Sequence, residues 1–229
     1  MRDELSANVP ANGRHLLYVA DPLCSWCYGF APVMAELASH FAGRLPVRLV
    51  MGGLRAGNTT PMRDTDKDYI RNAWTKVSAA TGQPFDMTFF DREGFIYDTE
   101  PACRAVVVAR DWGAGAGESA LAVKARISQA FYAHNRDVTT VDVLADIAAE
   151  AGYDRAAFHA RLLMPESKNA TFRDFLTSQE LGVRGFPMLA AGSEATGYAL
   201  VTNGFRPIDG LVEALETWLA TGAPVRKDG

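Results

Sequence analysis

The chain has 229 residues, of which 48% are hydrophobic and 22% are charged, and its formal net charge at pH 7 is −4. This length fits one large domain or two closely joined ones, and the composition is that of a globular protein rather than a disordered chain. The mild acidity and the lack of a long Lys/Arg cluster argue against nucleic acid as a partner.

The N-terminal segment carries none of the features of a secretory signal. Residues 1–12 mix Arg2, Asp3 and Glu4 with small residues and have no apolar central run. No later stretch offers 18 consecutive apolar residues, which a membrane-spanning helix would need. We therefore expect a cytoplasmic protein without a membrane partner.

The first predicted elements are a strand, a helix and a second strand. Residues 15–20 (HLLYVA) form a short apolar run ended by an Asp-Pro pair, as in a buried strand that enters a turn. Apolar residues then recur at helical spacing over 30–41, and Pro32 is expected to bend that helix. Residues 47–51 form the next apolar run. This order predicts a βαβ unit with parallel strands and a right-handed crossover.

The middle of the chain, residues 60–182, is predicted to be almost entirely helical. Thr99, Thr140 and Asp154 stand where helix N-caps belong. The glycine-rich stretch 113–117 (GAGAG) is expected to form a flexible link inside this block.

The C-terminal part returns to strands. Residues 188–191 and 198–201 predict an antiparallel hairpin, and a last helix is expected to begin at Pro207, because proline favours the first helical position. The sequence therefore predicts an α/β fold in which a helical insertion interrupts a small core made from the two ends of the chain.

A Cys-x-x-C pair, Cys24 and Cys27, carries the chemistry that we predict. Two cysteines on one helical turn can form a disulfide with little backbone movement. The pair follows a strand and opens a helix, so the first sulfur lies near unpaired N–H groups that favour the thiolate. We therefore predict that Cys24 attacks and that the more shielded Cys27 resolves the mixed disulfide.

Two other interpretations of this pair stay open, an inert pair of core cysteines and half of a zinc site. The remaining zinc ligands would have to come from Cys103 and four scattered histidines, which do not have the spacing of zinc ligands, so we expect no metal. Cys103 itself is either a small core residue or a third redox thiol, because it follows a proline near a predicted helix start.

Two further residues near the predicted site have two interpretations each. Asp21 is a turn residue or a proton acceptor, through water, for Cys27. Pro187 precedes a predicted strand, where its ring cannot donate a ladder hydrogen bond, and a cis peptide bond in a tight turn is one solution.

The run 21–30 (DPLCSWCYGF), with Gly185-Phe186-Pro187 far downstream, resembles the DsbA-like family of thiol-disulfide oxidoreductases, and most closely its FrnE-type branch. This resemblance covers nearly the whole chain. It implies a thioredoxin-like domain, formed by 13–59 and 183–222, with a large helical domain over 60–182 inserted between its βαβ and ββα parts. It also implies that Cys24 is the nucleophile, Cys27 the resolving thiol, and Pro187 a cis-proline beside them.

The resemblance also indicates how substrates would bind. In the family, the backbone of the residue before the cis-proline pairs with an extended substrate segment. In this chain Gly185 comes just before that residue and is expected to help bind the substrate. That residue is Phe186, which is bulkier than the usual Val or Thr, so substrate choice is expected to differ. We expect Ser25 and Trp26, between the cysteines, to be largely exposed, with Trp26 forming part of an apolar docking patch.

The direction of the reaction is predicted from the same two residues. Ser25-Trp26 lacks the His of strongly oxidising family members, so the thiolate should be less stabilised and the disulfide less oxidising. We therefore predict a reductant or isomerase of protein or small-molecule disulfides, with no bound cofactor and with glutathione or another small thiol as candidate co-substrate.

Two other functions fit the same fold. One is a glutathione-dependent isomerase or transferase of the 2-hydroxychromene-2-carboxylate isomerase or kappa-class type. Those proteins use a single Ser or thiol, so the complete Cys-x-x-C pair counts against this function. The other is an interaction domain with an inactive redox pair. Nothing in the sequence indicates the natural substrate, the electron donor or the oligomeric state.

Overall fold

The computed structural model describes residues 13–113 and 117–222. The predicted signal-free segment 1–12 and the centre of the predicted glycine link, 114–116, lie outside the described residues. Among the helices in the described ranges, none combines the length and apolar character needed to cross a membrane.

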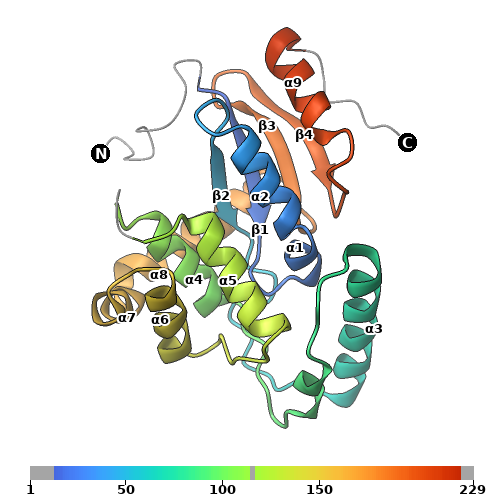
Figure 1. Ribbon diagram of the computed structural model, residues 1–229. Coiled ribbons are helices and arrows are strands. Elements are labelled where there is room, and N and C mark those ends of the chain that lie inside the picture. Colours follow the sequence, from blue (N-terminus) through green and yellow to red (C-terminus); the bar gives the residue numbers. More distant parts are fainter. Residues whose placement is uncertain (1–12, 114–116, 223–229) are drawn as a thin grey trace.

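A four-stranded sheet with the strand order β2-β1-β3-β4 forms the upper part of the molecule (Figure 1). The first strand, β1 (His15–Ala20), pairs in parallel with β2 (Val47–Met51) and antiparallel with β3 (Met188–Ser193). The last strand, β4 (Gly197–Asn203), forms the predicted hairpin with β3. Both predicted strand pairings are therefore confirmed, and the hairpin strands are longer than predicted.

The central strand β1 is buried on both faces, which its continuous apolar run requires. Leu16 and Tyr18 point into the main core, which includes residues of α2 (Ala31–His40) and α9 (Leu211–Thr221). Leu17 and Val19 point to the opposite face and pack in a smaller apolar cluster. Figure 1 shows α2 and α9 lying across one face of the sheet.

The segment between β2 and β3 is mainly helical, as predicted, and most of its helices gather beyond one end of the sheet (Figure 1). The elements of this helical block are α3 (Asp64–Thr81), the 3-10 helix η2 (Met87–Asp91), α4 (Glu100–Arg110), α5 (Ala120–Tyr132), α6 (Val141–Glu150), α7 (Arg155–Leu163) and α8 (Pro165–Glu180). The domain boundaries placed at 59/60 and 182/183 stay a prediction.

The predicted N-caps in this block are found at Thr99, Thr140 and Asp154. Only the Asp154 side chain forms the expected capping bond among these three, accepting from the N–H of Ala157 at 2.8 Å. The position of a cap was therefore easier to predict than the bond it makes.

Two helix boundaries differ from the sequence prediction. The bent helix expected over 30–41 is preceded by a separate short helix, α1 (Ser25–Gly29), and the helical backbone is interrupted at Phe30. Pro32 lies in the first turn of α2, where its missing N–H costs no hydrogen bond, rather than inside a longer helix. The last helix begins at Leu211, not at Pro207, because Gly210 at its N-cap takes a left-handed conformation with φ 71°.

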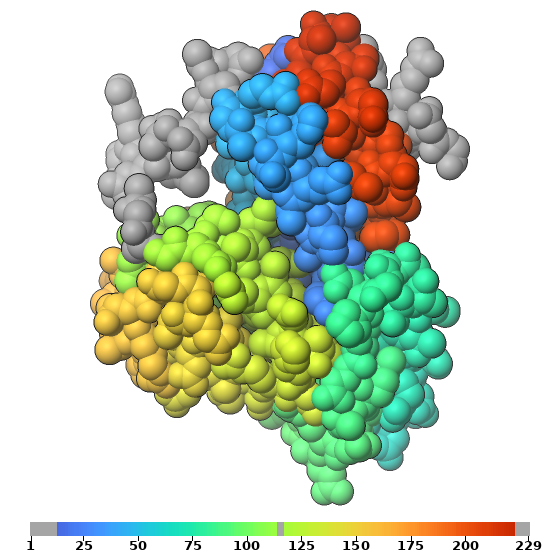
Figure 2. Space-filling view, in the orientation of Figure 1, coloured from blue at the N-terminus to red at the C-terminus, as the bar shows by residue number. Residues whose placement is uncertain are grey.

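Helix α1 lies between the sheet and the helical block and contacts both α3 and α5. Figure 2 shows the blue segment that contains α1 and α2 running down between the teal surface of α3 and the yellow-green surface of α5. The ring of Tyr28 in α1 stacks on Tyr132 of α5, with the ring centroids 5.0 Å apart. Helix α1 is thus packed against two helices of the helical block.

An ion pair joins the helical block to the end of β2. The Arg110 guanidinium contacts the Asp174 carboxylate at 2.7 Å, and Asp174 also accepts from the backbone N–H of Met51 at 2.8 Å. Arg110 donates in addition to the carbonyl of Leu49 at 3.1 Å. Both charged side chains are largely buried, so each one offsets the cost of burying the charge of the other.

We expect the substitution Asp174→Ala to lower the free energy of unfolding by about 2 to 3 kcal/mol, because it leaves a buried guanidinium and a buried N–H without this partner. Urea unfolding followed by circular dichroism measures the change. The matched control is Asp111→Ala, which removes a half-exposed carboxylate from the same guanidinium and should cost about 0 to 1 kcal/mol. Equal losses of unfolding free energy in the two variants would contradict the conclusion that the buried Asp174 is the main partner of Arg110.

Candidate active site

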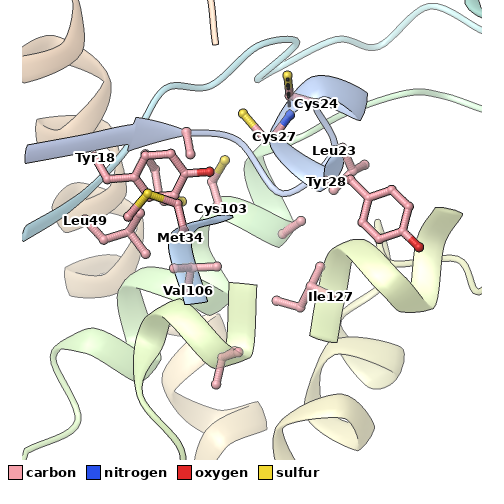
Figure 3. Close-up of a cluster of buried hydrophobic side chains, with 14 of the residues drawn as sticks. Tyr18, Leu23, Cys24, Cys27, Tyr28, Met34, Leu49, Cys103, Val106 and Ile127 are labelled. Carbon is pink, nitrogen blue, oxygen red and sulfur yellow. Dashed lines mark hydrogen bonds between the residues drawn. The ribbon is translucent and has the colours of Figure 1, made fainter. Parts of the chain in front are cut away.

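Cys24 is the N-cap residue of α1, which places its sulfur at the helix start as predicted. Its backbone is extended, and its Sγ accepts the backbone N–H of Cys27 at 3.4 Å (Figure 3). An N-cap side chain usually supplies an oxygen to the unpaired N–H groups of the first turn. Here the Cys24 sulfur replaces that oxygen, so the predicted nucleophile is itself the acceptor of the capping hydrogen bond.

A second contact of the Cys24 sulfur comes from the segment before β3, 162 residues further along the chain. Its Sγ donates to the carbonyl oxygen of Phe186 at 3.6 Å, and the Phe186-Pro187 peptide bond is cis. The structure therefore brings Cys24, Cys27 and Pro187 together, as the resemblance implied. Cys24 is 6% exposed and Cys27 is 0% exposed, so Cys27 is the more shielded thiol of the two.

The two thiols have pKa values that move in opposite directions. The hydrogen bond from the Cys27 thiol is the main cause that lowers the pKa of Cys24, and the backbone N–H of Cys27 adds to it, against the effect of burial. Burial is the main cause that raises the pKa of Cys27 well above its ordinary value, and the contact with Cys24 adds to it. The first proton to leave the pair therefore comes from Cys24.

Asp21 is fully buried, and its backbone carbonyl accepts the N–H of Cys24 at 3.2 Å. Its carboxylate accepts the backbone N–H of Leu23 at 2.8 Å and that of Leu54 at 2.7 Å. The first bond is that of an Asx turn, which agrees with the interpretation of Asp21 as a turn residue. Burial raises the pKa of this carboxyl although both N–H bonds lower it.

Cys103 lies in α4 and faces the same carboxylate. Its Sγ contacts Asp21 Oδ2 at 3.4 Å, and the residue is fully buried. Burial, and next the charge of Asp21, raise the pKa of this thiol well above its ordinary value. The helix start therefore does not activate Cys103.

The residues expected to meet the substrate are less exposed than predicted. Ser25 and Trp26 are half-buried rather than largely exposed, because the Trp26 ring packs against Phe205 with the ring centroids 5.8 Å apart. The ring of Phe186 lies against Gly52, where a Cβ would come within 2.1 Å of it. The bulk of Phe186 is thus packed at the end of β2, and its carbonyl is the part that contacts Cys24. Gly185 is half-buried beside it.

Three side chains of the helical block, which we did not predict, hold the segment that carries the dithiol. The Tyr97 hydroxyl donates to the carbonyl of Leu23, Ser128 donates to that of Pro22, and Lys124 donates to that of Cys27, each at 2.7 Å. Lys124 and Ser128 are four residues apart and are both buried in α5, but this spacing alone did not indicate their role in the sequence.

A family model described as the DSBA-like thioredoxin domain matches residues 16–216. A protein from Nitrosomonas europaea, provisionally named a protein disulfide isomerase, has a crystal structure with a TM-score of 0.83 at 36% identity, covering 92% of this chain and 99% of that one. The cytosolic disulfide reductase DsbM of Pseudomonas aeruginosa has a TM-score of 0.72 at 29% identity, covering 90% and 98%.

Two curated relatives, from Halalkalibacterium halodurans and Shouchella clausii, are described as the ClpXP adapter protein SpxH. They are 24% identical over 167 residues and 26% identical over 206 residues, which is 71% and 87% of this chain. The chain spans 53% and 65% of the length of these relatives. Because the family model matches most of the chain, and because the sheet and the helical block have the arrangement of its solved relatives, the protein belongs to the DsbA-like thioredoxin family.

Proposed function

We propose that the protein is a thiol-disulfide oxidoreductase that reduces or isomerises disulfides of proteins or small molecules through Cys24 and Cys27. The observation that carries this proposal is the position of the Cys24 sulfur, which caps α1 and faces the carbonyl before the cis-proline. A thiol with a lowered pKa at a helix start is the nucleophile that such chemistry needs.

The reaction begins when the Cys24 thiolate attacks one sulfur of the substrate disulfide and the other sulfur leaves as a thiolate. Cys27 then loses its proton and attacks the Cys24 sulfur, which forms the Cys24–Cys27 disulfide and releases the reduced substrate. We propose Asp21 as the proton acceptor for Cys27, through water, because its buried carboxyl has a raised pKa. In the docking step, Pro187 and the Phe186 backbone receive the substrate, with Gly185, Ser25 and Trp26 around them.

The reducing direction is supported by the residues between the cysteines and by one relative. Ser25-Trp26 adds no positive charge to the thiolate, unlike the His of the strongly oxidising family members. DsbM is described as a cytosolic disulfide reductase, and one of its solved structures contains GSH. We therefore propose glutathione or another small thiol as the electron donor, and the cytoplasm as the compartment.

The two other functions make different demands on the same residues. The solved 2-hydroxychromene-2-carboxylate isomerase is 19% identical to this chain, which shows a shared fold alone. A glutathione-dependent isomerase would not need Cys27. The adapter role belongs to the SpxH relatives, and an adapter function here would need neither thiol.

In the reduced protein we expect Cys24 alone to react quickly with iodoacetamide. The alkylation rate of Cys24 should rise about tenfold per pH unit until the pH reaches its pKa and should then level off. Because the pKa of Cys24 is lowered, this levelling off should occur at a lower pH than for an ordinary cysteine. Burial should keep Cys27 and Cys103 unreactive until the protein unfolds. Peptide mass spectrometry gives the rate at each site. A comparable rate at Cys27 or Cys103 would be evidence against this assignment.

We expect the wild type to reduce insulin and the variant Cys24→Ser to lose this activity. Cys103→Ser is the matched control and should keep the activity, because the reaction does not use that thiol. The reduction potential of the pair, measured against glutathione, should lie closer to the value of about −270 mV for thioredoxin than to about −120 mV for DsbA. A potential near that of DsbA would refute the reducing direction.

The variant Cys27→Ala should accumulate mixed disulfides on Cys24, because the resolving thiol is missing. Mass spectrometry of the trapped species under non-reducing conditions would identify the substrate as a protein or as glutathione. The double variant Cys24→Ser with Cys27→Ala is the control and should trap nothing. If Cys27→Ala kept full glutathione-dependent isomerase or transferase activity, the alternative function would replace the proposed one.

A further inference from the structure

Lys124 is a buried lysine on α5, and it is only 1% exposed. Its ammonium donates to the carbonyl oxygen of Cys27 at 2.7 Å, and it forms no salt bridge within the described part of the chain. A buried ammonium is costly unless an opposite charge compensates it, and a carbonyl supplies only a partial charge. The position of Lys124 therefore calls for an anion close by.

The groups around Lys124 can supply that anion. Burial lowers the pKa of Lys124, whereas a negative charge at Cys27, Cys24, Asp21 or Cys103, in that order of effect, raises it. Of the three thiols, only Cys24 has a lowered pKa, so it is the one that ionises first. The charge of Lys124 in turn lowers the pKa of both thiols of the pair. Lysine and thiolate therefore stabilise each other across the site.

The remaining titratable groups near Cys24 do not provide a second cation. Those that interact with it are Tyr18 of β1, Asp21 after β1, Cys27 of α1, Tyr97 before α4, Lys124 of α5 and Tyr132 of α5. Cys103 of α4 faces Asp21 and interacts with Lys124. All of these groups except Lys124 are neutral or negative, so Lys124 is the one cation in this set.

The compensation depends on the redox state of the pair. When Cys24 and Cys27 form a disulfide, neither sulfur carries a charge. The acidic groups that still interact with Lys124 are then Asp21 and the buried thiol of Cys103. When the disulfide is reduced by two electrons and Cys27 takes up one proton, Cys24 becomes a thiolate whose charge interacts with Lys124. A buried cation at this position therefore stabilises the reduced, ionised form of the pair more than the disulfide.

We propose that Lys124 is the positioning residue of the dithiol, holding the start of α1 through the Cys27 carbonyl and supplying, from the helical block, the positive charge that Ser25-Trp26 lacks. This inference rests on the proposed role of Cys24 as nucleophile. It assigns Lys124 an electrostatic effect on the thiolate as well as a hydrogen bond.

Substitutions of Lys124 separate these two effects. Lys124→Gln keeps an N–H donor but removes the charge, and Lys124→Met removes both. We expect both variants to raise the pKa of Cys24 by about one unit, which corresponds to about a tenfold lower thiolate fraction below the pKa. The reduction potential should become more negative in both. The matched control Lys76→Gln removes an exposed lysine of α3 and should change neither quantity.

The pKa of Cys24 is measured from the pH dependence of thiolate absorbance and of alkylation, with circular dichroism to check folding. A wild-type pKa in Lys124→Gln combined with a raised pKa in Lys124→Met would show that only the hydrogen bond matters and would overturn the proposal. An unchanged pKa in both folded variants would also overturn it. These measurements need no substrate, so a failure of insulin reduction would reject the proposed function separately.

A second measurement uses the wild type and covers the case in which the variants do not fold. Because the coupling is mutual, the pKa of Lys124 should be higher in the reduced protein than in the disulfide form. NMR titration of the labelled lysine side-chain nitrogen in both redox states measures this difference. Identical pKa values of Lys124 in the two states would overturn the proposal.

Discussion

The site depends on one hydrogen bond, in which the backbone N–H of Cys27 donates to the sulfur of Cys24 at the start of α1. The first N–H groups of a helix have no partner within the helix, and negative charge near them is stabilised. A thiolate at the N-cap therefore stabilises the helix start, and the helix start stabilises the thiolate. The residue that caps the helix and the residue that would react are the same, so any change that unwinds the first turn of α1 also raises the pKa of Cys24.

The helical block does more than cover this helix start. Between the end of β1 and α1, the carbonyls of Pro22 and Leu23 have no strand to pair with, and side chains from the block bind them. Lys124 binds the carbonyl of Cys27 in the same way. Because Lys124 and Ser128 share one face of α5, this helix binds the dithiol segment at two points. The orientation of the cysteines is thus set by contacts between segments about 100 residues apart in the sequence.

What could be predicted from the sequence follows from the range of the interactions involved. The strands 15–20 and 47–51 were found with the correct bounds, because each is an apolar run between turn residues. The break at Phe30 was missed because this buried residue ends α1 and caps α2, so the apolar spacing continues through it. The positions of Cys24 and Cys27 at a helix start follow from local spacing. Lys124 could not be found, because lysine is ordinarily exposed and its partner is distant in the sequence.

Two buried residues of opposite charge act on the Cys24 thiol in addition to its hydrogen bonds and its burial. The hydrogen bond from the Cys27 thiol is the largest cause that lowers the pKa of Cys24, and the backbone N–H of Cys27 adds to it; among the charged groups, the Asp21 carboxylate raises this pKa and the Lys124 ammonium lowers it. Because Asp21, Lys124 and Cys24 are all buried, their charges are screened less than they would be in water. A Cys-x-x-C pair without a charged residue between its cysteines can therefore still hold a reactive thiolate. Under the role proposed for Lys124, the redox direction of this pair depends on Asp21 and Lys124 as well as on the two residues between the cysteines.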